Sequence, residues 1–193
     1  LKDLIEVFLQ HRREVVTRRT VFNLRKARER GHVLEGLAVA LANIDDFIAI
    51  IRNAPTPPVA KAELMTRSWD SKLVREMLTR SRSDGGVVNA DDYRPDGLEK
   101  AYGMGSDGLY RLSDTQAQEI LQMRLQRLTG LEQDKIVAEY KEVMAEIEDL
   151  LDILARPERV STIITGELGT IRQEFGQTKI GARRSLVEHS SYD

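Results

Sequence analysis

Three glycines near the middle of the chain have the spacing of a loop that binds nucleotide phosphates. Gly103, Gly105 and Gly108 fit the pattern G-x-G-x-x-G. Such a loop must follow a strand and open a helix, because the phosphates are held by free N–H groups at the helix N-terminus. Here the pattern follows an irregular stretch and precedes residues 109–112, a short extended segment, so the next helix begins too late. We therefore interpret the three glycines as a surface turn.

The residue types that most often perform catalysis or bind metals are too few and too scattered to form a site. The chain has no cysteine, which excludes disulfides, thiolate nucleophiles and zinc–thiolate centres. His11, His32 and His189 are far apart, and no two histidines have the i, i+4 spacing of a helical metal pair. No Ser-His-Asp or Cys-His motif is present. We expect no catalytic residue, metal site or cofactor in this chain.

Basic side chains crowd one stretch of the expected first helix. Residues 11–30 contain eight positive and two negative side chains, a net charge of +6. One interpretation is a solvated helix with a few ion pairs, and the other is a surface that contacts phosphates without reading sequence. Phe22 is the one aromatic residue in this stretch, too few for a series of stacked bases, so sequence reading is not expected. The candidate DNA-facing residues are Arg12, Arg13, Arg18 and Arg19.

Two apolar series with alternating steps of three and four residues predict the elements that carry these residues. One comprises Leu34, Leu37, Leu41, Ile44, Ile48 and Ile51, and the other Ile136, Tyr140, Val143, Ile147, Leu150 and Leu154. This 3.5-residue period is typical of coiled coils. The acidic residues between positions 132 and 152 fit the solvated face of such a helix. We predict a mainly α fold: a long antiparallel coiled-coil arm capped by a small helical globular head that dimerises.

The chain divides into four expected parts. Residues 1–53 form the ascending coiled-coil helix, which Pro55, Pro57 and Pro58 terminate. Residues 54–131 form the head, with short helices over 59–65 and 72–80 and Trp69 as an apolar plug. Residues 132–175 are the returning coiled-coil helices, with a kink at 156–157, and residues 176–193 are a tail.

The head is expected to carry the dimer contact on a helix over residues 114–129. Ser113 and Gln116 have the spacing of a capping box, and Gly130 is expected to end the helix. Apolar residues occupy more than one face of this helix, more than one intramolecular seam requires. The predicted interface residues are Gln116, Ile120, Met123, Arg124 and Arg127.

A hinge is expected in the returning helices. Pro157 interrupts the helix after Arg156, and Gly166 and Gly169 weaken the last segment. The first helix is weakened at Gly31 and Gly36. We therefore expect bending to concentrate at these positions.

Composition agrees with long exposed helices. Of 193 residues, 31% are charged and 5% aromatic, and the net charge is −2, so no global basic field indicates nucleic acid. No apolar run approaches the ~20 residues that span a membrane, and no signal peptide is present. We expect a cytoplasmic location without membrane contact, and interpret the chain as a piece of a longer protein.

Several strings resemble the A subunits of bacterial type IIA DNA topoisomerases. They are HRREVVTRRT at residues 11–20, LEGL at 34–37, ANID at 42–45, and QA at 116–117 followed by MRLQRLTGLE at 123–132. The resemblance covers nearly the whole chain in order. The string ALANID and the segment from Pro55 to about Tyr102 are more similar to DNA gyrase than to topoisomerase IV.

The resemblance implies the coiled-coil arm and the C-gate, through which a transported DNA duplex leaves the enzyme. In the family the catalytic tyrosine lies upstream, and no tyrosine here matches its motif. ATP hydrolysis and Mg²⁺ binding belong to the B subunit. The resemblance therefore implies a homodimer through the head, an A2B2 complex with gyrase B, double-stranded DNA as the substrate, and negative supercoiling by the parent enzyme. The alternatives are the equivalent region of topoisomerase IV and a stand-alone DNA-binding helical hairpin.

Overall fold

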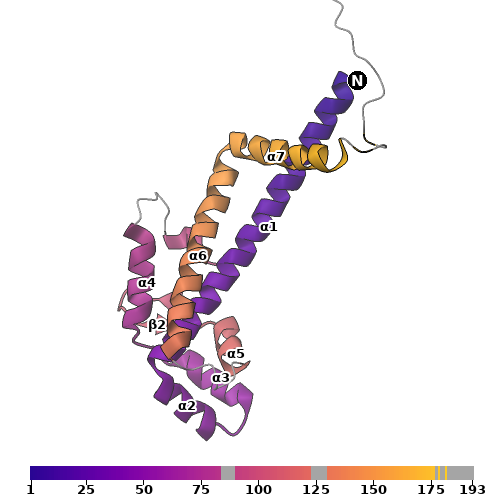
Figure 1. The fold of residues 1–193 in the computed structure, drawn as a ribbon. Coiled ribbons are helices and arrows are strands. Elements are labelled where there is room, and N and C mark those ends of the chain that lie inside the picture. Colours follow the sequence, from indigo (N-terminus) through magenta and orange to yellow (C-terminus); the bar gives the residue numbers. More distant parts are fainter. Residues whose placement is uncertain (84–89, 123–129, 177, 179–180, 182–193) are drawn as a thin grey trace, which may run out of the picture. The chain divides into compact units, whose positions relative to one another are not determined.

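The computed structural model describes residues 1–83, 90–122, 130–176, 178 and 181. These residues are mainly helical, as predicted (Figure 1). The chain forms two compact units: unit 1 comprises Leu1–Val21 and Asp152–Asp193, and unit 2 comprises Phe22–Leu151. Helix α1 (Lys2–Ala42) and helix α6 (Gly130–Ala155) each contribute residues to both units.

The single helix predicted over residues 2–53 is two helices. α1 ends at Ala42, and α2 (Ile44–Asn53) follows after Asn43, whose backbone is not helical (φ −125°, ψ 34°). The Asn43 side-chain amide donates to the carbonyl oxygens of Val39 and Asp70, each at 2.9 Å. The first apolar series therefore does not continue as one seam, because Phe47 and Ile50 are the buried residues of α2.

The remaining short elements belong to unit 2. They are α3 (Pro57–Thr66), α4 (Lys72–Ser83), the 3-10 helix η1 (Ala90–Tyr93), strands β1 (Gly103–Met104) and β2 (Tyr110–Arg111), and α5 (Asp114–Gln122). Two prolines start α3, where a missing N–H costs no hydrogen bond. α6 begins at Gly130, two residues before the expected start at Glu132. The predicted helix end at residues 123–129 lies outside the described residues.

Trp69 is the apolar plug of this unit, as predicted. Its ring lies 4.2 Å from that of Phe47, centroid to centroid, and its indole N–H donates to the Leu64 carbonyl at 3.0 Å. Its backbone exchanges two hydrogen bonds of 2.8 Å with Tyr110 and so extends the antiparallel β1–β2 pair. One aromatic residue thereby connects α2, α3 and the strands, while α3 also packs against α2 and α5.

Within unit 2, α1 and α6 contact each other in opposite directions. Arg30 forms an ion pair with Glu139 at 2.6 Å, and the Tyr140 hydroxyl donates to Glu35 at 3.0 Å. Gly31 faces Met144, further along α6. The apolar residues predicted for the second series are buried from Ile136 to Leu150, while Leu154 is only partly buried.

Unit 1 has its own small core. Val16 of α1 packs with Ile153 of α6 and with Val160 and Ile164 of α7 (Pro157–Phe175). α7 begins at Pro157, as predicted, because Arg156 before it is extended (φ −121°, ψ 105°). The helix boundary at 156–157 is therefore confirmed. Residues 177, 179–180 and 182–193 of the predicted tail lie outside the described residues.

The two glycines of α1 differ in what surrounds them, which gives a testable contrast. A Cβ at Gly36 would lie 2.8 Å from Gln116 Cγ and 2.9 Å from Gln116 Cβ, whereas at Gly31 it would meet the flexible Met144 Cε at 2.9 Å. We expect Gly36→Ala to destabilise unit 2 by about 2 kcal/mol through overpacking. Gly31→Ala should be nearly neutral, because Met144 can move and alanine favours the helix. Chemical denaturation of both variants checks this, and equal stabilities would contradict it.

Candidate functional site

The four candidate DNA-facing arginines lie in unit 1 on different sides of α1. Arg13, Arg18 and Arg19 are exposed, whereas Arg12 is partly buried. Arg12 and Arg19 are seven residues apart and flank the buried Val16 on the side of α1 that meets α7. Arg18 lies 3.8 Å from Glu14. The sequence grouped these arginines as one stripe, and in the structure Arg12 and Arg19 share one partner, Glu167.

One carboxylate of α7 pairs with both of these arginines. Glu167 Oε1 accepts a hydrogen bond from Arg19 at 2.5 Å, and Glu167 Oε2 accepts one from Arg12. The hydrogen bond from Arg19, with the charges of both arginines, lowers the pKa of Glu167 below its usual value. The carboxylate therefore stays ionised at neutral pH and neutralises part of the predicted basic surface.

The predicted hinge residues lie at the start of α7 and within it. Arg156 directly precedes the helix, and Pro157, Gly166 and Gly169 are part of it. Arg156 and Arg159 both contact the carboxylate of Asp152, the latter at 2.7 Å, so the helix start is tied to the end of α6. Space is open around Gly166 and Gly169, since an added Cβ would meet nothing within 4 Å at either. No close packing in the described part requires glycine there. The proposed bending at these two positions remains a prediction.

The predicted dimer-interface residues fall into two groups. Gln116 and Ile120 are buried inside unit 2, with exposed fractions of 0% and 4%. Their side chains belong to the interior of the single chain, which corrects the expectation that they face a second copy. Met123, Arg124 and Arg127 lie outside the described residues, and their interface role remains a prediction. The exposed residues of α5 are polar, among them Gln118 and Glu119.

Gln116 is at the centre of a buried polar network. Its side-chain N–H₂ donates to the His32 carbonyl at 2.6 Å and to the Tyr110 hydroxyl at 2.7 Å. Its side-chain oxygen accepts from the Ser113 backbone N–H at 3.0 Å, and the Ser113 hydroxyl accepts from the Gln116 backbone N–H at 3.4 Å. The predicted capping box is therefore confirmed. The same amide also connects α5 to α1 and β2.

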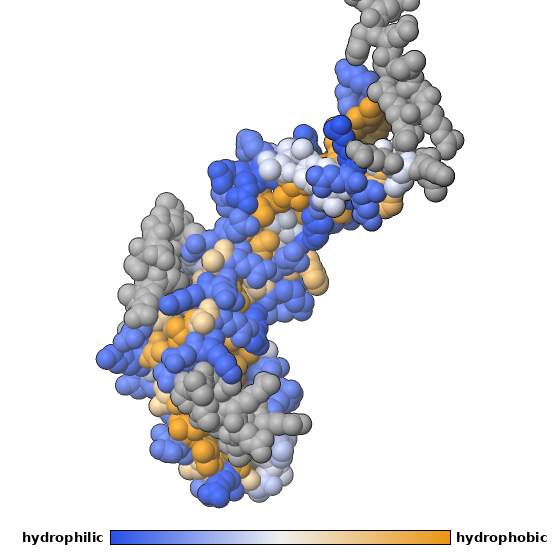
Figure 2. Space-filling view, viewed as in Figure 1, coloured by the Kyte–Doolittle hydropathy of each residue, from blue (hydrophilic) through white to orange (hydrophobic). Residues whose placement is uncertain are grey.

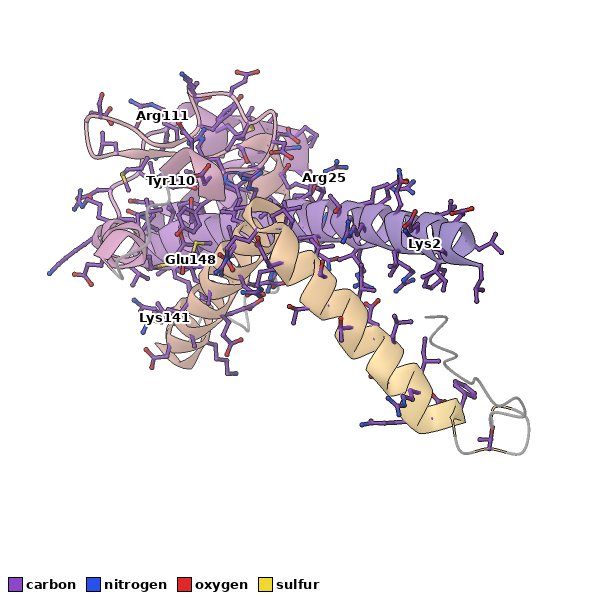
Figure 3. The ribbon with its side chains drawn as sticks, turned by 90° about the horizontal axis from the view of Figure 1, so that it is seen from above. Lys2, Arg25, Tyr110, Arg111, Lys141 and Glu148 are labelled. Carbon is purple, nitrogen blue, oxygen red and sulfur yellow. The ribbon has the colours of Figure 1, made fainter. Side chains whose placement is uncertain are left out.

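Glu35 extends this network towards α6. Tyr110 donates to one oxygen of its carboxylate at 2.7 Å, and Tyr140 donates to the other at 3.0 Å. Burial raises the pKa of Glu35, while the two phenols and the positive charge of Arg94 oppose the rise. Burial, with the nearby Glu35 carboxylate, raises the pKa of Tyr110. Figure 3 labels Tyr110 on its strand.

The network determines the tautomer of His32. Its Nδ1 lies 3.2 Å from the Gln116 side-chain nitrogen, whose two hydrogens already point to the His32 carbonyl and the Tyr110 hydroxyl. Because that nitrogen cannot accept, an Nδ1–H would have no acceptor there, so Nδ1 is unprotonated. Nε2 then carries the proton and donates to the Ser113 hydroxyl at 2.7 Å. Burial, reinforced by the charge of Arg94, lowers the pKa of His32 to about 4. His32 is therefore neutral at physiological pH. No buried side-chain nitrogen or oxygen in the described part lacks a hydrogen-bond partner.

A small cavity of about 180 Å³ adjoins this network. Its lining residues include His32, Glu35, Tyr93, Arg94 and Tyr140. Tyr93 donates to Glu148 of α6 at 2.7 Å, and burial together with that carboxylate raises the pKa of Tyr93. Arg94 donates to the carbonyl oxygens of Glu99 and Tyr102.

The glycines form a turn, as the sequence indicated, but this turn connects two short strands, and Gly103 lies in the first of them. Gly103 and Gly108 have positive φ of 90° and 75°, and residues 103–111 form the antiparallel β1–β2 pair. The Gly105 N–H bonds to the Leu109 carbonyl at 2.8 Å. The next helix, α5, begins only at Asp114, so the turn does not open a helix that could hold phosphates.

Within the described part of the chain, no three His, Cys, Asp or Glu residues are grouped as ligands for a metal ion. In the same residues, none of the helices has the length and apolar character needed to cross a bilayer.

Large apolar side chains remain exposed in unit 1. They lie near the start of α1 and the end of α7, and they contrast with the charged surface in Figure 2. Exposed apolar groups in a cluster commonly mark a contact surface. They include Leu4, Ile5, Phe8, Ile171 and Phe175.

Comparison with known proteins assigns the family. The family model for the A subunit of DNA gyrase/topoisomerase IV matches residues 1–169. The chain therefore belongs to this family of DNA gyrase and topoisomerase IV A subunits, and the resemblance stated from its sequence is confirmed.

Its similarity to the A subunit of DNA gyrase extends over the full chain. It is 49% identical over 193 residues to the A subunit from Pseudomonas aeruginosa, covering 100% of this chain and 20% of the relative. It is 51% identical over 193 residues to the one from Salmonella typhimurium, again over the whole chain and 21% of the relative. With the Escherichia coli protein it shares 54% identity over 140 residues, 72% of this chain and 15% of the relative. The chain thus spans about a fifth of the length of the curated relatives it matches over its full extent.

Proposed function

We propose that this chain is the exit gate (C-gate) and dimerisation arm of the A subunit of a DNA gyrase. The observation that carries the proposal is the opposite direction of α1 and α6 in unit 2, where Gly31 meets Met144 and Glu35, four residues later, meets Tyr140. Such pairing brings the two ends of a long insertion together. In this proposal the paired helices form a coiled-coil arm, and the helices between them form its head.

The parent enzyme in this proposal is a cytoplasmic type II topoisomerase that supercoils DNA negatively by passing one duplex through another. It works as an A2B2 complex with gyrase B, which uses ATP and Mg²⁺. This chain would contribute a movable protein contact rather than a chemical step.

The dimer contact in this proposal lies in the segment after α5. Gln116 and Ile120 hold α5 inside unit 2, so they position the segment instead of forming its contact surface. Met123, Arg124 and Arg127 follow directly in the sequence and remain the proposed contact residues. A two-fold contact would place each of them near its own symmetry copy or near the others.

The exposed apolar side chains of unit 1 support a longer parent. In the proposal, other parts of the parent protein cover Leu4, Phe8 and Phe175, which are 72%, 47% and 52% exposed here. The burial of such groups is favourable by about 25 cal/mol per Å² of apolar surface.

Two alternatives have specific support. The family description names topoisomerase IV as well as gyrase, so the equivalent region of that enzyme is the first. The second is a stand-alone DNA-binding helical hairpin, which is favoured by the basic residues between positions 11 and 30, the basic stripe. Pairing of Arg12 and Arg19 with Glu167 reduces the charge available to that alternative.

Sedimentation velocity over a wide range of protein concentration tests the gate. We expect a reversible dimer, and we expect Met123→Glu to weaken it by roughly tenfold or more, because two buried like charges would face each other. Gln118→Glu adds the same charge at an exposed position of α5 and should leave association unchanged. A strict monomer at high concentration, or equal weakening by both variants, would contradict the proposal.

A further inference from the structure

Glu167 of α7 forms ion pairs with Arg12 and Arg19, the two arginines of α1 that face α7. Arg12, Val16 and Arg19 share one side of α1, and Val16 is fully buried against α7 and the end of α6. The arginine side chains lie at the border of this contact, 28% and 48% exposed, with the Glu167 side chain at 29%. All three charged groups thus remain within reach of solvent and of another ligand.

The pairing has the geometry of a two-pronged clamp. Each oxygen of the carboxylate accepts from a different guanidinium, and the two arginines are two helical turns apart. A charge-assisted contact of this kind satisfies a single donor of each arginine, while a guanidinium has five. Phosphate oxygens bind guanidinium groups by the same chemistry, so they compete for the same donors.

The helix that carries the carboxylate is only weakly held near the clamp. Gly166 precedes Glu167 directly and Gly169 follows two residues later, and space around both is open. Each glycine lowers helix stability by roughly 1 kcal/mol relative to alanine. Val160 and Ile164, the buried residues of α7, lie in its first half. The clamp is therefore the polar attachment nearest to the less buried half of the helix.

We propose that Glu167 masks Arg12 and Arg19, and that duplex DNA displaces it to bind these two arginines through its phosphates. The proposal goes beyond the gate and concerns the DNA-facing role that the sequence predicts for these two arginines. The ligand is the backbone of double-stranded DNA, read without sequence, because guanidinium groups bind phosphate oxygens whatever the base sequence.

Glu167→Gln in the full 193-residue chain tests the mask. Binding of a short mixed-sequence DNA duplex is measured by fluorescence anisotropy at several salt concentrations. Two freed arginines should steepen the salt slope by up to about 2, so a roughly tenfold gain in affinity at about 50 mM salt would disappear near 200 mM. Glu174→Gln is the matched control, because Glu174 is an exposed acid on the same helix and its replacement changes net charge equally.

Two further measurements separate the mask from a general charge effect and from misfolding. The gain should vanish in an Arg12→Gln, Arg19→Gln background, and circular dichroism should show that helix content is preserved. Glu167→Asp, whose shorter side chain cannot reach both arginines, should give a smaller gain than glutamine. An equal gain from Glu174→Gln, or no gain from Glu167→Gln, would overturn the proposal. Either result could occur while sedimentation still shows the dimer, so failure of the mask and failure of the gate are distinguishable.

Discussion

Gln116→Leu should destabilise unit 2 by about 4 kcal/mol, because it removes three buried hydrogen bonds and leaves the Ser113 backbone N–H without its side-chain acceptor. The His32 carbonyl and the Ser113 N–H would each lose a hydrogen bond, and the Tyr110 hydroxyl would lose its donor. A buried polar group without a partner costs about 1–3 kcal/mol. Leucine has a similar volume, so the loss reports mainly the hydrogen bonds rather than a cavity. Chemical denaturation followed by circular dichroism measures it.

Gln118→Leu provides the matched control for this variant. Gln118 lies two residues away on the exposed side of α5, and its replacement should change stability by at most about 0.5 kcal/mol. Tyr110→Phe removes a second member of the network. Its cost and that of Gln116→Leu should add to more than the double variant loses, because the two share a hydrogen bond. A loss below about 1 kcal/mol for Gln116→Leu would show that the network is not important for stability.

The second large effect is a loss of stability in mild acid caused by His32. Its pKa falls from the usual 6.5 to about 4 in the folded chain, so below pH 6.5 the unfolded state binds a proton that the folded state rejects. Stability from this residue is fully present above pH 6.5 and declines as the pH falls to about 4. The linkage amounts to about 3 kcal/mol over that interval. Protonation would also direct an Nδ1–H at the donating amide of Gln116.

His32→Asn isolates this contribution, since the Asn oxygen can replace the acceptor Nδ1 but does not titrate. The unfolding free energies of the two proteins should differ most at neutral pH and converge by about 3 kcal/mol towards about pH 4. His11→Asn is the matched control, because it makes the same replacement at an exposed position of α1. Parallel profiles for the parent chain and His32→Asn would contradict the expectation.

Glu35 acts in the opposite direction, and the difference measurement removes it. Its pKa is raised by burial, so the folded chain takes up a proton there before the unfolded chain does. That uptake stabilises the fold as the pH falls through the raised pKa. Both residues belong to one network with Tyr110 and Tyr140. The free energy of unfolding of the parent chain should therefore fall less in acid than His32 alone would cause.

Features that depend on neighbours in the sequence could be predicted. Pro157 gave the start of α7, because proline favours the first turn and forces the preceding residue out of the helical region. Ser113 and Gln116 gave the capping box, whose hydrogen bonds span three residues. The second apolar series predicted the buried face of α6 from Ile136 to Leu150.

Features that depend on residues far apart in the sequence could not be predicted. The steps of three and four continue through Asn43, so the periodicity concealed the break that its amide stabilises by bonding to Asp70. Asp45 and Asp46 lie in the first turn of α2, and acidic residues there are a start signal that could have indicated a new helix. Neither apolar series included Phe47, which is buried because its ring packs against Trp69.

The site was predicted less well than the fold. Gln116 had a local role as a cap, and nothing local revealed that its amide also reaches His32, 84 residues away. Glu35 offered one signal, since an acid beside the apolar Leu34 and Leu37 positions is unusual on a packed helix face. For Arg12 the charge count was correct, but its partner Glu167 lies 155 residues further along the chain.

The hydrogen bonds of the buried network also govern the order in which unit 2 can assemble. They connect Glu35 to residues 75 and 105 positions later, so a ribosome releases most of α1 long before Tyr110 and Tyr140 emerge. Pairings of such sequence separation fold slowly, because closing the loop costs entropy before the contacts form. The newly made α1 therefore emerges with the Glu35 carboxylate and Leu34 exposed to water, and unit 2 reaches its final structure only once α6 has been synthesised.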